Sequence, residues 1–374
     1  MKLSTLTILF ILTSCQGSNS LGTSGSGLIE TENTNDPIEF EVGEDFNLTI
    51  DSNSEFATMT LSNIQQNGDT LEFEGSVILE TGRLSLTNTI ENGGEQTLNF
   101  RNSFDDPIVL LHIMTANDTE TVTVRGRNLT GSNISVFLQD PSAGSHGTEE
   151  IAYVVVESGE YELGNGVLLE AAHYSSTDNH NASEAYESNN VTLGNSYSSA
   201  PNAFSSLNTY TNTAFKSSVI SAVSTSSIGL QQSSGDSGTA TALEDISYFV
   251  MSDFTGDIQG QAFEVKSESG SSDSGFDNGT PAQFSFSSFG STPDILSDGR
   301  TDAGADGYFA RGSGLWSSTQ YGVYAWEDTI GDSERAHINE NFSVFAAEPN
   351  SEITKYETTA SFISPSYDIS NITD

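Results

Sequence analysis

The chain has 374 residues and a formal net charge of −41 at pH 7, from 52 acidic and only 11 basic residues. This balance excludes nucleic acid as a partner, because binding a polyanion requires a cationic surface. Hydrophobic residues make up 35% of the chain, with 21 Phe and 12 Tyr, so there is enough apolar material for a core. The acidic residues are dispersed, which favours a solvated surface, suited to a salty setting, over one acidic binding tail.

Residues 1–14 have the pattern of a signal peptide. Lys2 supplies a positive charge, and an apolar run over residues 6–12, interrupted by Thr7, follows it. This run is too short to cross a bilayer, which takes about 20 apolar residues. The small residues before Cys15 resemble a lipobox, where a signal peptidase cuts ahead of a lipid-modified cysteine. The alternative is an ordinary secretory signal with a cysteine at the cleavage site by chance.

Cys15 is the only cysteine, so a mature chain lipidated there has no partner for a disulfide, no thiolate nucleophile and no cysteine metal site. The lipobox resemblance implies that Cys15 carries the lipid that anchors the chain to a membrane. Gln16 follows it where an aspartate commonly favours inner-membrane retention, so in a Gram-negative envelope we expect the outer membrane or the cell surface. Residues 15–36, rich in Gly, Ser, Thr and Asn, predict the anchor and a flexible linker.

The rest of the chain has the pattern of an all-β protein. Alternating stretches such as residues 121–125 (TVTVR) and 134–138 (ISVFL) recur between clusters of Gly, Asn, Asp and Ser, and helical periodicity is nearly absent. Residues 37–78 predict a short β region, with strands at residues 40–42 and 71–73.

Two landmarks recur with one period beyond residue 78. Prolines 94 and 92 residues apart are each followed by a threonine eight residues later: Pro107 and Thr115, Pro201 and Thr209, Pro293 and Thr301. Glutamates 95 and 96 residues apart precede similar apolar stretches: Glu149, Glu244 and Glu340. We therefore predict tandem antiparallel β-sandwich repeats at residues 79–167, 168–261 and 262–374, the last with a C-terminal tail, arranged as a rod.

The first repeat resembles H-type lectin domains and their bacterial relatives. The resemblance rests on residues 80–84, 97–110, 115, 122–125 and 146–153, and extends over residues 79–348 in three divergent copies. It implies six-stranded sandwiches. The best-known members of the family form trimers and bind N-acetylgalactosamine-type sugars near subunit edges, through an acidic residue, an arginine, a histidine and aromatics.

The resemblance places candidate ligand-binding residues in the first and third copies. Arg125 and Arg311 stand at the family's arginine, whereas the second copy offers only Lys216 nearby, so we interpret it as a spacer. His146 and His337 stand at the family's histidine, but neither follows the aromatic residue that family lectins present.

The third copy adds Asp302, Asp306 and Trp316, which supply the hydrogen-bonding groups and the aromatic face that a sugar needs. The alternative is that tryptophans are packed and arginines form surface ion pairs. Residues 298–307 (DGRTDAGADG) also alternate oxygen ligands with glycines, which Ca²⁺ could use, although tight turns explain the same pattern and no EF-hand motif is present. We assign no cofactor.

His146 and Glu149, like His337 and Glu340, are three residues apart, and in an extended strand such residues point to opposite faces. We therefore expect them to hydrogen-bond neighbouring loops instead of forming a catalytic pair. There is no serine-nucleophile elbow, phosphate loop or zinc motif, so an enzyme is not expected.

The sequence thus predicts a lipid-anchored protein of the cell envelope whose lectin-like repeats bind carbohydrate or mediate adhesion. The alternative is a structural component that contacts envelope proteins without binding sugar. The oligomeric state and the ligand stay open.

Overall fold

The structure is a computed structural model that describes residues 75–164, 166–180, 190–235, 242–269, 274–287, 289–304, 306–331 and 333–356. It also gives six short strands nearer the N-terminus, in three antiparallel pairs: β1 (Thr7–Ile8) with β4 (Ile38–Glu39), β2 (Ser20–Gly22) with β3 (Leu28–Glu30), and β5 (Leu48–Thr49) with β6 (Thr60–Leu61). Cys15 and the strands expected at residues 40–42 and 71–73 lie outside the described residues.

The chain divides into two compact units, Met1–Ser76 with Lys355–Asp374, and Val77–Thr354. The second unit, here called the body, contains all three repeats. None of the described residues forms a helix with the length and apolar character needed to cross a membrane.

Each repeat in the body is a six-stranded sandwich with the same topology. Numbering the strands of one copy one to six, the first sheet has the order one, six, three and the second the order two, five, four. Copy 1 consists of β7 (Gly75–Leu86), β8 (Gln96–Asn99), β9 (Pro107–Ile113), β10 (Thr123–Arg127), β11 (Asn133–Gln139) and β12 (Glu149–Glu157), with a 3-10 turn, η1 (Ile90–Asn92), after its first strand.

Copies 2 and 3 repeat this order. Copy 2 consists of β14 (Leu168–Ser176), β16 (Asn190–Thr192), β17 (Asn202–Leu207), β18 (Ser217–Val223), β19 (Ser227–Ser233) and β20 (Glu244–Met251), and the short β15 (Asn179–His180) pairs in parallel with β19. Copy 3 consists of β22 (Gln261–Ser269), β23 (Ala282–Ser285), β24 (Asp294–Gly299), β25 (Phe309–Trp316), β26 (Gln320–Trp326) and β27 (Asn341–Ala347). The prediction of an all-β chain with tandem antiparallel sandwiches is confirmed.

The core of each sandwich comes from alternate residues of facing strands. In copy 1, Val109, Leu111 and Ile113 of β9 pack with apolar residues of β11 and β12, as expected for strands whose side chains alternate between faces. The other face of β9 is buried too, since Ile108, Leu110 and His112 are at most 3% exposed. That second face must be covered by something outside the sandwich.

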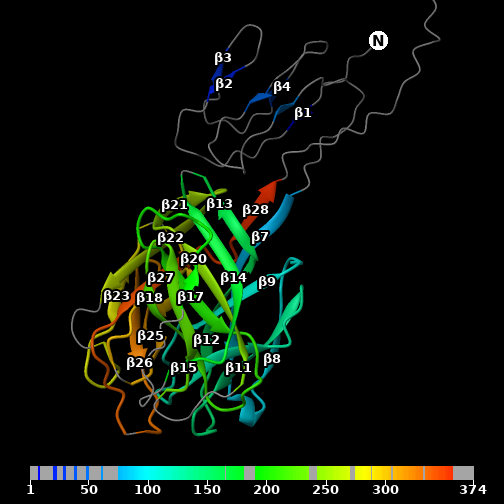
Figure 1. The fold of residues 1–374 in the computed structure, drawn as a ribbon. Helices are drawn as coiled ribbons and strands as arrows, with labels where there is room; N and C mark the ends of the chain where they lie inside the picture. Colours follow the sequence, from blue (N-terminus) through cyan, green and yellow to red (C-terminus); the bar gives the residue numbers. More distant parts are fainter. Residues whose placement is uncertain are drawn as a thin grey trace, which may run out of the picture. The chain divides into compact units, whose positions relative to one another are not determined.

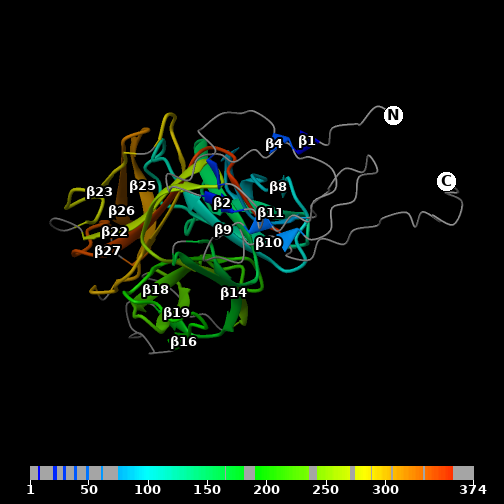
Figure 2. The same ribbon diagram turned by 90° about the horizontal axis from the view of Figure 1, so that it is seen from above.

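The neighbouring copies cover it. The third strands β9, β17 and β24 meet at the centre of the body, and Figure 2 shows the three copies as three lobes around this centre. Ser206 Oγ accepts a hydrogen bond of 2.8 Å from the backbone of Leu111, and Ser205 Oγ donates one of 2.8 Å to Asp298. The expected rod is therefore wrong for this body, because the third strands bury each other around a common axis, through apolar residues such as Leu110, Phe204 and Leu296 and through hydrogen-bonded polar residues.

The chain closes this ring with a strand that follows the last copy. After copy 1, β13 (Gly159–Glu162) pairs with β14 of copy 2, and after copy 2, β21 (Phe254–Ile258) pairs with β22 of copy 3. After copy 3, β28 (Glu352–Tyr356) pairs with β7 of copy 1, and the two strands lie side by side in Figure 1. Each first sheet thus gains a fourth strand from the segment that follows the preceding copy.

Replacing Ile353 of β28 by alanine tests this closure. Its side chain is fully buried, so we expect a loss of about 2–5 kcal/mol in the free energy of unfolding. Hydrogen exchange should show faster exchange in β7 than in β14 or β22, because only copy 1 depends on β28. Thr354→Ala, at a partly exposed position of the same strand, is the control. Equal urea midpoints for Ile353→Ala and the control would show that β28 does not hold the ring.

Candidate functional site

The repeated threonines and glutamates of the sequence meet in the structure. Glu149 and Glu244 begin the sixth strand of their copies, Glu340 directly precedes that of copy 3, and all three are at most 1% exposed. Each accepts a hydrogen bond from the threonine hydroxyl of its own copy, in the pairs Thr115 and Glu149, Thr209 and Glu244, and Thr301 and Glu340. The threonines and the glutamates recur with the same period because they hydrogen-bond each other within each copy.

The same carboxylates hold the loop that follows the third strand. Glu149 accepts the backbone N–H groups of Asn117 and Asp118 at 3.1 and 2.9 Å. Glu244 accepts that of Asn212 at 2.6 Å, and Glu340 accepts that of Ala303 at 2.8 Å. A buried carboxylate with several donors is stabilised in its charged form and fixes the loop around it.

An arginine from copy 3 enters the loop of copy 1. Arg311 Nη2 lies 2.8 Å from Glu149 Oε1, and both side chains are fully buried. The guanidinium also donates to the backbone carbonyls of Thr115, Asp118 and Glu120, at 3.3, 2.6 and 2.8 Å. We call Glu149 with these three carbonyls the arginine cage of copy 1.

Copy 2 has an equivalent arginine cage, filled from copy 1. Arg125 donates to the carbonyls of Thr209, Asn212 and Ala214 at 2.8, 3.3 and 3.3 Å, and to Glu244 Oε1 at 3.3 Å. In both cages the carbonyls belong to the threonine and to the residues three and five positions after it. The same arginine–glutamate interaction therefore occurs at two of the three interfaces between copies.

Burial makes these pairs decisive for stability. Burial opposes the charge of Glu149, but hydrogen bonds from His146 and Thr115 and the charge of Arg311 lower the pKa of Glu149 to about 2. Burial lowers the pKa of Arg125 to about 10, against the attraction of Glu244, so it stays protonated at neutral pH. Removing one partner of such a pair costs about 3–5 kcal/mol, because the other charge is left buried and unpaired.

Aromatic rings complete the cages. The guanidinium of Arg311 lies 4.3 Å from the ring centre of Trp326, and that of Arg125 lies 4.9 Å from the ring centre of Tyr210. Trp326 is fully buried and donates from Nε1 to Thr121 of copy 1. Arg125 and Arg311 therefore do not face an open groove.

The interface between copies 2 and 3 is built differently. Arg125 and Arg311 are each the third residue of the fourth strand of their copy, paired with Phe137 and Tyr324 on the fifth strand. The third residue of the fourth strand of copy 2 is Val219, which is paired with Gln231. Val219, and not Lys216, is thus the positional counterpart of the two arginines. Lys216 Nζ instead donates to Asn179 Oδ1 of its own copy at 2.9 Å.

A histidine supplies the positive charge beside Glu340. His337 is 3% exposed, with Nε2 3.0 Å from Glu340 Oε1 and Nδ1 2.5 Å from Glu327 Oε1. Burial opposes its protonation, but the hydrogen bonds and charges of Glu327 and Glu340 raise the pKa of His337 to about 9. His337 is therefore a cation at neutral pH.

His146 has a related place in copy 1, with Nε2 3.3 Å from Glu149 Oε1 and 3.5 Å from Arg311 Nη2. The expectation that each histidine and its glutamate diverge is wrong. His146 and His337 lie in loops before the sixth strand, so the alternation of an extended strand does not apply to them.

The remaining candidates lie apart from one another. Asp302 has a side chain only 2% exposed, with Oδ2 3.9 Å from His180 Nε2, and burial, together with the charge of Glu340, raises its pKa to about 7. Asp306 and Trp316 are partly exposed. The structure therefore distributes the candidate residues over the three interfaces between copies and does not bring them together in a single pocket.

Trp316 lies at the boundary between copies 3 and 1. Its Nε1 donates to the carbonyl of Pro293 at 3.0 Å, and the guanidinium of Arg83 lies 5.0 Å from its ring centre. Arg83 is 29% exposed and pairs with Asp294 at 2.7 Å. No sequence pattern groups Arg83 with Trp316, because the two residues are far apart in the chain and belong to different copies.

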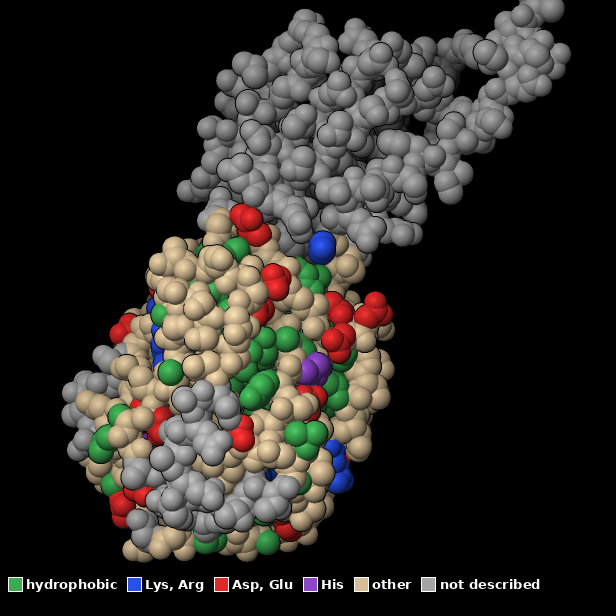
Figure 3. Space-filling view, in the orientation of Figure 1, with side chains coloured by type: hydrophobic (Ala, Val, Ile, Leu, Met, Phe, Trp, Pro, Cys, Tyr) green, Lys and Arg blue, Asp and Glu red, His purple; other side chains and the backbone are tan. Residues whose placement is uncertain are grey.

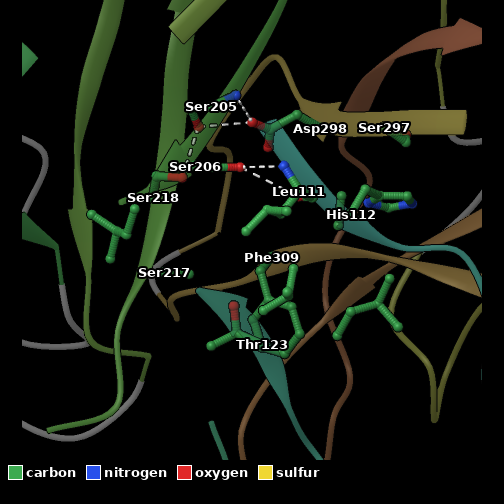
Figure 4. A pocket seen from close by; sticks show the side chains of 14 residues that line it. Leu111, His112, Thr123, Ser205, Ser206, Ser217, Ser218, Ser297, Asp298 and Phe309 are labelled. Atoms are coloured by element: carbon green, nitrogen blue, oxygen red, sulfur yellow. Dashed lines mark hydrogen bonds between the residues drawn. The ribbon is translucent and has the colours of Figure 1, made fainter. Parts of the chain in front are cut away.

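A small cavity lies where the third and fourth strands of the three copies meet (Figure 4). It has room for a few waters, and polar residues such as Ser206, Ser218 and Asp298 line part of its wall. Burial raises the pKa of Asp298 in its wall to about 7, despite hydrogen bonds from Ser205. Burial lowers the pKa of His112 to about 3, and His112 Nε2 lies 2.5 Å from the hydroxyl of Tyr321.

Within the described ranges, no group of three or more His, Cys, Asp and Glu side chains is arranged to hold a metal ion. Figure 3 shows acidic side chains scattered over one face of the body, with few Lys and Arg among them. The dispersed charge of the sequence thus appears on the surface as separate acidic groups.

No protein-family model matches the chain, and no solved structure matches it significantly. Halomucin from Haloquadratum walsbyi (strain DSM 16790 / HBSQ001) is 23% identical over 121 residues, or 31% of this chain. The match spans 1% of the length of halomucin.

The stability of the body should fall as pH rises from about 6.5 to 9. A histidine whose folded pKa is raised stabilises fully below its unfolded pKa of about 6.5, and this contribution disappears as the pH passes the folded value. Calorimetric melting between pH 6 and 10 should show the decline, worth up to about 3 kcal/mol.

His337→Gln should flatten that decline. His173→Gln is the control, because the pair of His173 and Asp245 is partly exposed and screened, so it should leave most of the slope. Identical pH profiles for the wild type and His337→Gln would contradict the assignment of a charged His337.

Proposed function

We propose that this chain is a non-catalytic cell-surface protein, anchored by lipid on Cys15, whose three sandwiches form one preassembled head for adhesion. The observation that carries the proposal is the closed ring, in which buried charge pairs and β28 fix the copies to one another. Such a head presents repeated loops in fixed positions, which favours multivalent contact with a surface. The similarity to a segment of halomucin supports a surface setting.

A role without catalysis is supported by how the chemically versatile residues are used. His146 and Glu149 contact each other and Arg311, while His337 bridges Glu327 and Glu340. These groups are buried between copies, where a substrate would have to displace an interface to reach them. These residues therefore stabilise the assembled body.

Carbohydrate is the ligand we propose for the head, at the patch formed by Trp316, Arg83 and Asp294. A partly exposed indole offers an apolar face for a sugar ring, and the guanidinium and carboxylate beside it can hydrogen-bond hydroxyl groups. The patch lies at an edge between two copies. The family that the first copy resembles also binds sugars near subunit edges, which supports this placement.

The second candidate function is structural, with the head contacting envelope proteins instead of sugars. The burial of Arg125 and Arg311 favours it, because the arginines expected to contact a sugar are committed to holding the copies together. Affinity isolation from the native envelope distinguishes the two. A stoichiometric protein partner, in the absence of glycan binding, would favour the structural role.

Trp316→Ala should weaken glycan binding about tenfold, since it removes the stacking face. The measurement is binding of the lipid-free Cys15→Ser chain to an array of immobilised glycans. Leu243→Ala removes a side chain that is 56% exposed on copy 2 and should bind as the wild type does. No binding by the unmodified head to any glycan would sink the carbohydrate proposal and leave the structural one.

Cys15→Ser should abolish incorporation of labelled palmitate and move the chain from the membrane fraction to the soluble fraction. An ordinary secretory signal would give no palmitate label in the wild type. Labelling of the wild type that persists in Cys15→Ser would place the lipid elsewhere and contradict the anchor.

A further inference from the structure

The loop of copy 3 has the parts of an arginine cage but receives no arginine. Glu340 holds its loop through the Thr301 hydroxyl and the backbone of Ala303, as the other two glutamates do. By position, the carbonyls equivalent to those that bind Arg311 and Arg125 belong to Thr301, Gly304 and Asp306. The residue that copy 2 directs toward this cage is Val219, which is 2% exposed and has no charge.

The face of copy 2 around Val219 carries an unsatisfied polar group. Gln231 is paired with Val219 across the strands, so the two side chains share one face of the sheet. Gln231 is 1% exposed, and neither its amide nitrogen nor its amide oxygen has a hydrogen-bond partner. Buried amides are nearly always hydrogen-bonded, so the unpartnered oxygen of Gln231 is a donor atom available to a bound cation, whereas its NH2 group can pair only with an acceptor.

The opposite side of this interface carries an unsatisfied carboxylate. Asp302 stands where copy 1 has Ala116 and copy 2 has Tyr210, so only this loop places an acid next to its threonine. Its side chain is 2% exposed, and Oδ1 has no hydrogen-bond partner. The loop faces the sheet of Gln231 directly, because a Cβ added to Gly307 would lie 2.8 Å from Ser233 Oγ of copy 2.

Carboxylates gather on the copy 3 side of this interface, opposite His180 of copy 2, whose Nε2 lies 3.9 Å from Asp302 Oδ2. Glu327, Glu340 and Asp302 lie near one another, and His337 is the protonated group that contacts two of them. In copies 1 and 2 the corresponding glutamate is neutralised by a guanidinium that also saturates three carbonyls. Copy 3 has the acids and the carbonyls without that cation.

We propose that the interface between copies 2 and 3 binds a hard metal cation, Ca²⁺ being the best fit, in the place that an arginine takes in the other two interfaces. The donors are all oxygen atoms, from the Asp302 carboxylate, the Gln231 amide and the carbonyls of the loop, which is the ligand type that Ca²⁺ prefers. This site goes beyond the proposed surface function and does not depend on it. It assigns the acidic residues of the segment 298–307 a role as metal ligands, in addition to the formation of tight turns.

The test is the thermal stability of the full chain after treatment with EGTA, measured with CaCl₂, MgCl₂ or NaCl at equal ionic strength. Equal ionic strength is essential, because any salt screens the self-repulsion of a chain with a charge of −41. We expect Ca²⁺ to raise the melting temperature by at least about 3 °C and calorimetric titration to give one site per chain. No shift beyond that of NaCl, or no stoichiometric binding, would overturn the proposal.

Two variants locate the site. Val219→Arg supplies the missing guanidinium, so it should melt in EGTA at least as high as the wild type does with Ca²⁺ and should no longer respond to Ca²⁺. Asp302→Asn should keep the fold and reduce Ca²⁺ affinity at least about tenfold. The control is Asp257→Asn on the exposed face of β21, which should keep the full response.

Three outcomes count against the site. One is a Ca²⁺ response that persists unchanged in both Val219→Arg and Asp302→Asn. Another is an equal loss of response in Asp257→Asn, which would indicate screening of surface charge instead of a site. The third is a wild-type chain that, in EGTA, becomes more stable below pH 7 but does not respond to Ca²⁺. That result would show that Asp302 is neutralised by protonation and not by a metal ion.

Discussion

The buried pair of an arginine and a glutamate from the next copy is the interaction on which the body depends. The chain has only seven arginines, and each contacts another copy or the closing strand: Arg83 with Asp294, Arg101 with Glu352, Arg125 with Glu244, Arg127 with the ring of Tyr210, Arg300 with Asn202, Arg311 with Glu149, and Arg335 with the Thr119 carbonyl. In a strongly acidic chain, these few cations stabilise the contacts between copies, where an unpaired carboxylate would cost most.

The sequence was sufficient to predict the sandwiches because their determinants are local. Alternation along residues 134–138 reports one buried face, and the recurring threonine and glutamate report one loop contact within each copy. The ring was not predictable in this way. Residues 108–113 are apolar on both faces except at His112, which indicates that the second face is buried but not what covers it. β28 carries no sign of pairing with β7, since its partner lies some 270 residues earlier.

The candidate site was predictable in its residues but not in their environment. A resemblance to a ligand-binding family singles out Arg125, Arg311, His146 and His337 in the sequence, and in the structure the two arginines lie at edges between copies. Their partners lie 162 residues away for Arg311 and 119 for Arg125. A motif within one copy cannot distinguish an arginine that faces a sugar from one that enters the next copy, because the two differ only in what lies opposite.

Covalent fusion explains why the three interfaces can differ. In a symmetric homotrimer one sequence builds all three interfaces, so the loss of an arginine would empty every cage at once. In a single chain, copy 2 can carry Val219 while copies 1 and 3 keep Arg125 and Arg311, and the strands β13, β21 and β28 still hold the ring together. The interface relieved of its arginine then retains a glutamate that must be neutralised by other means. His337 supplies a positive charge there, because its hydrogen bonds to Glu327 and Glu340 and the charges of both raise its pKa against the effect of burial.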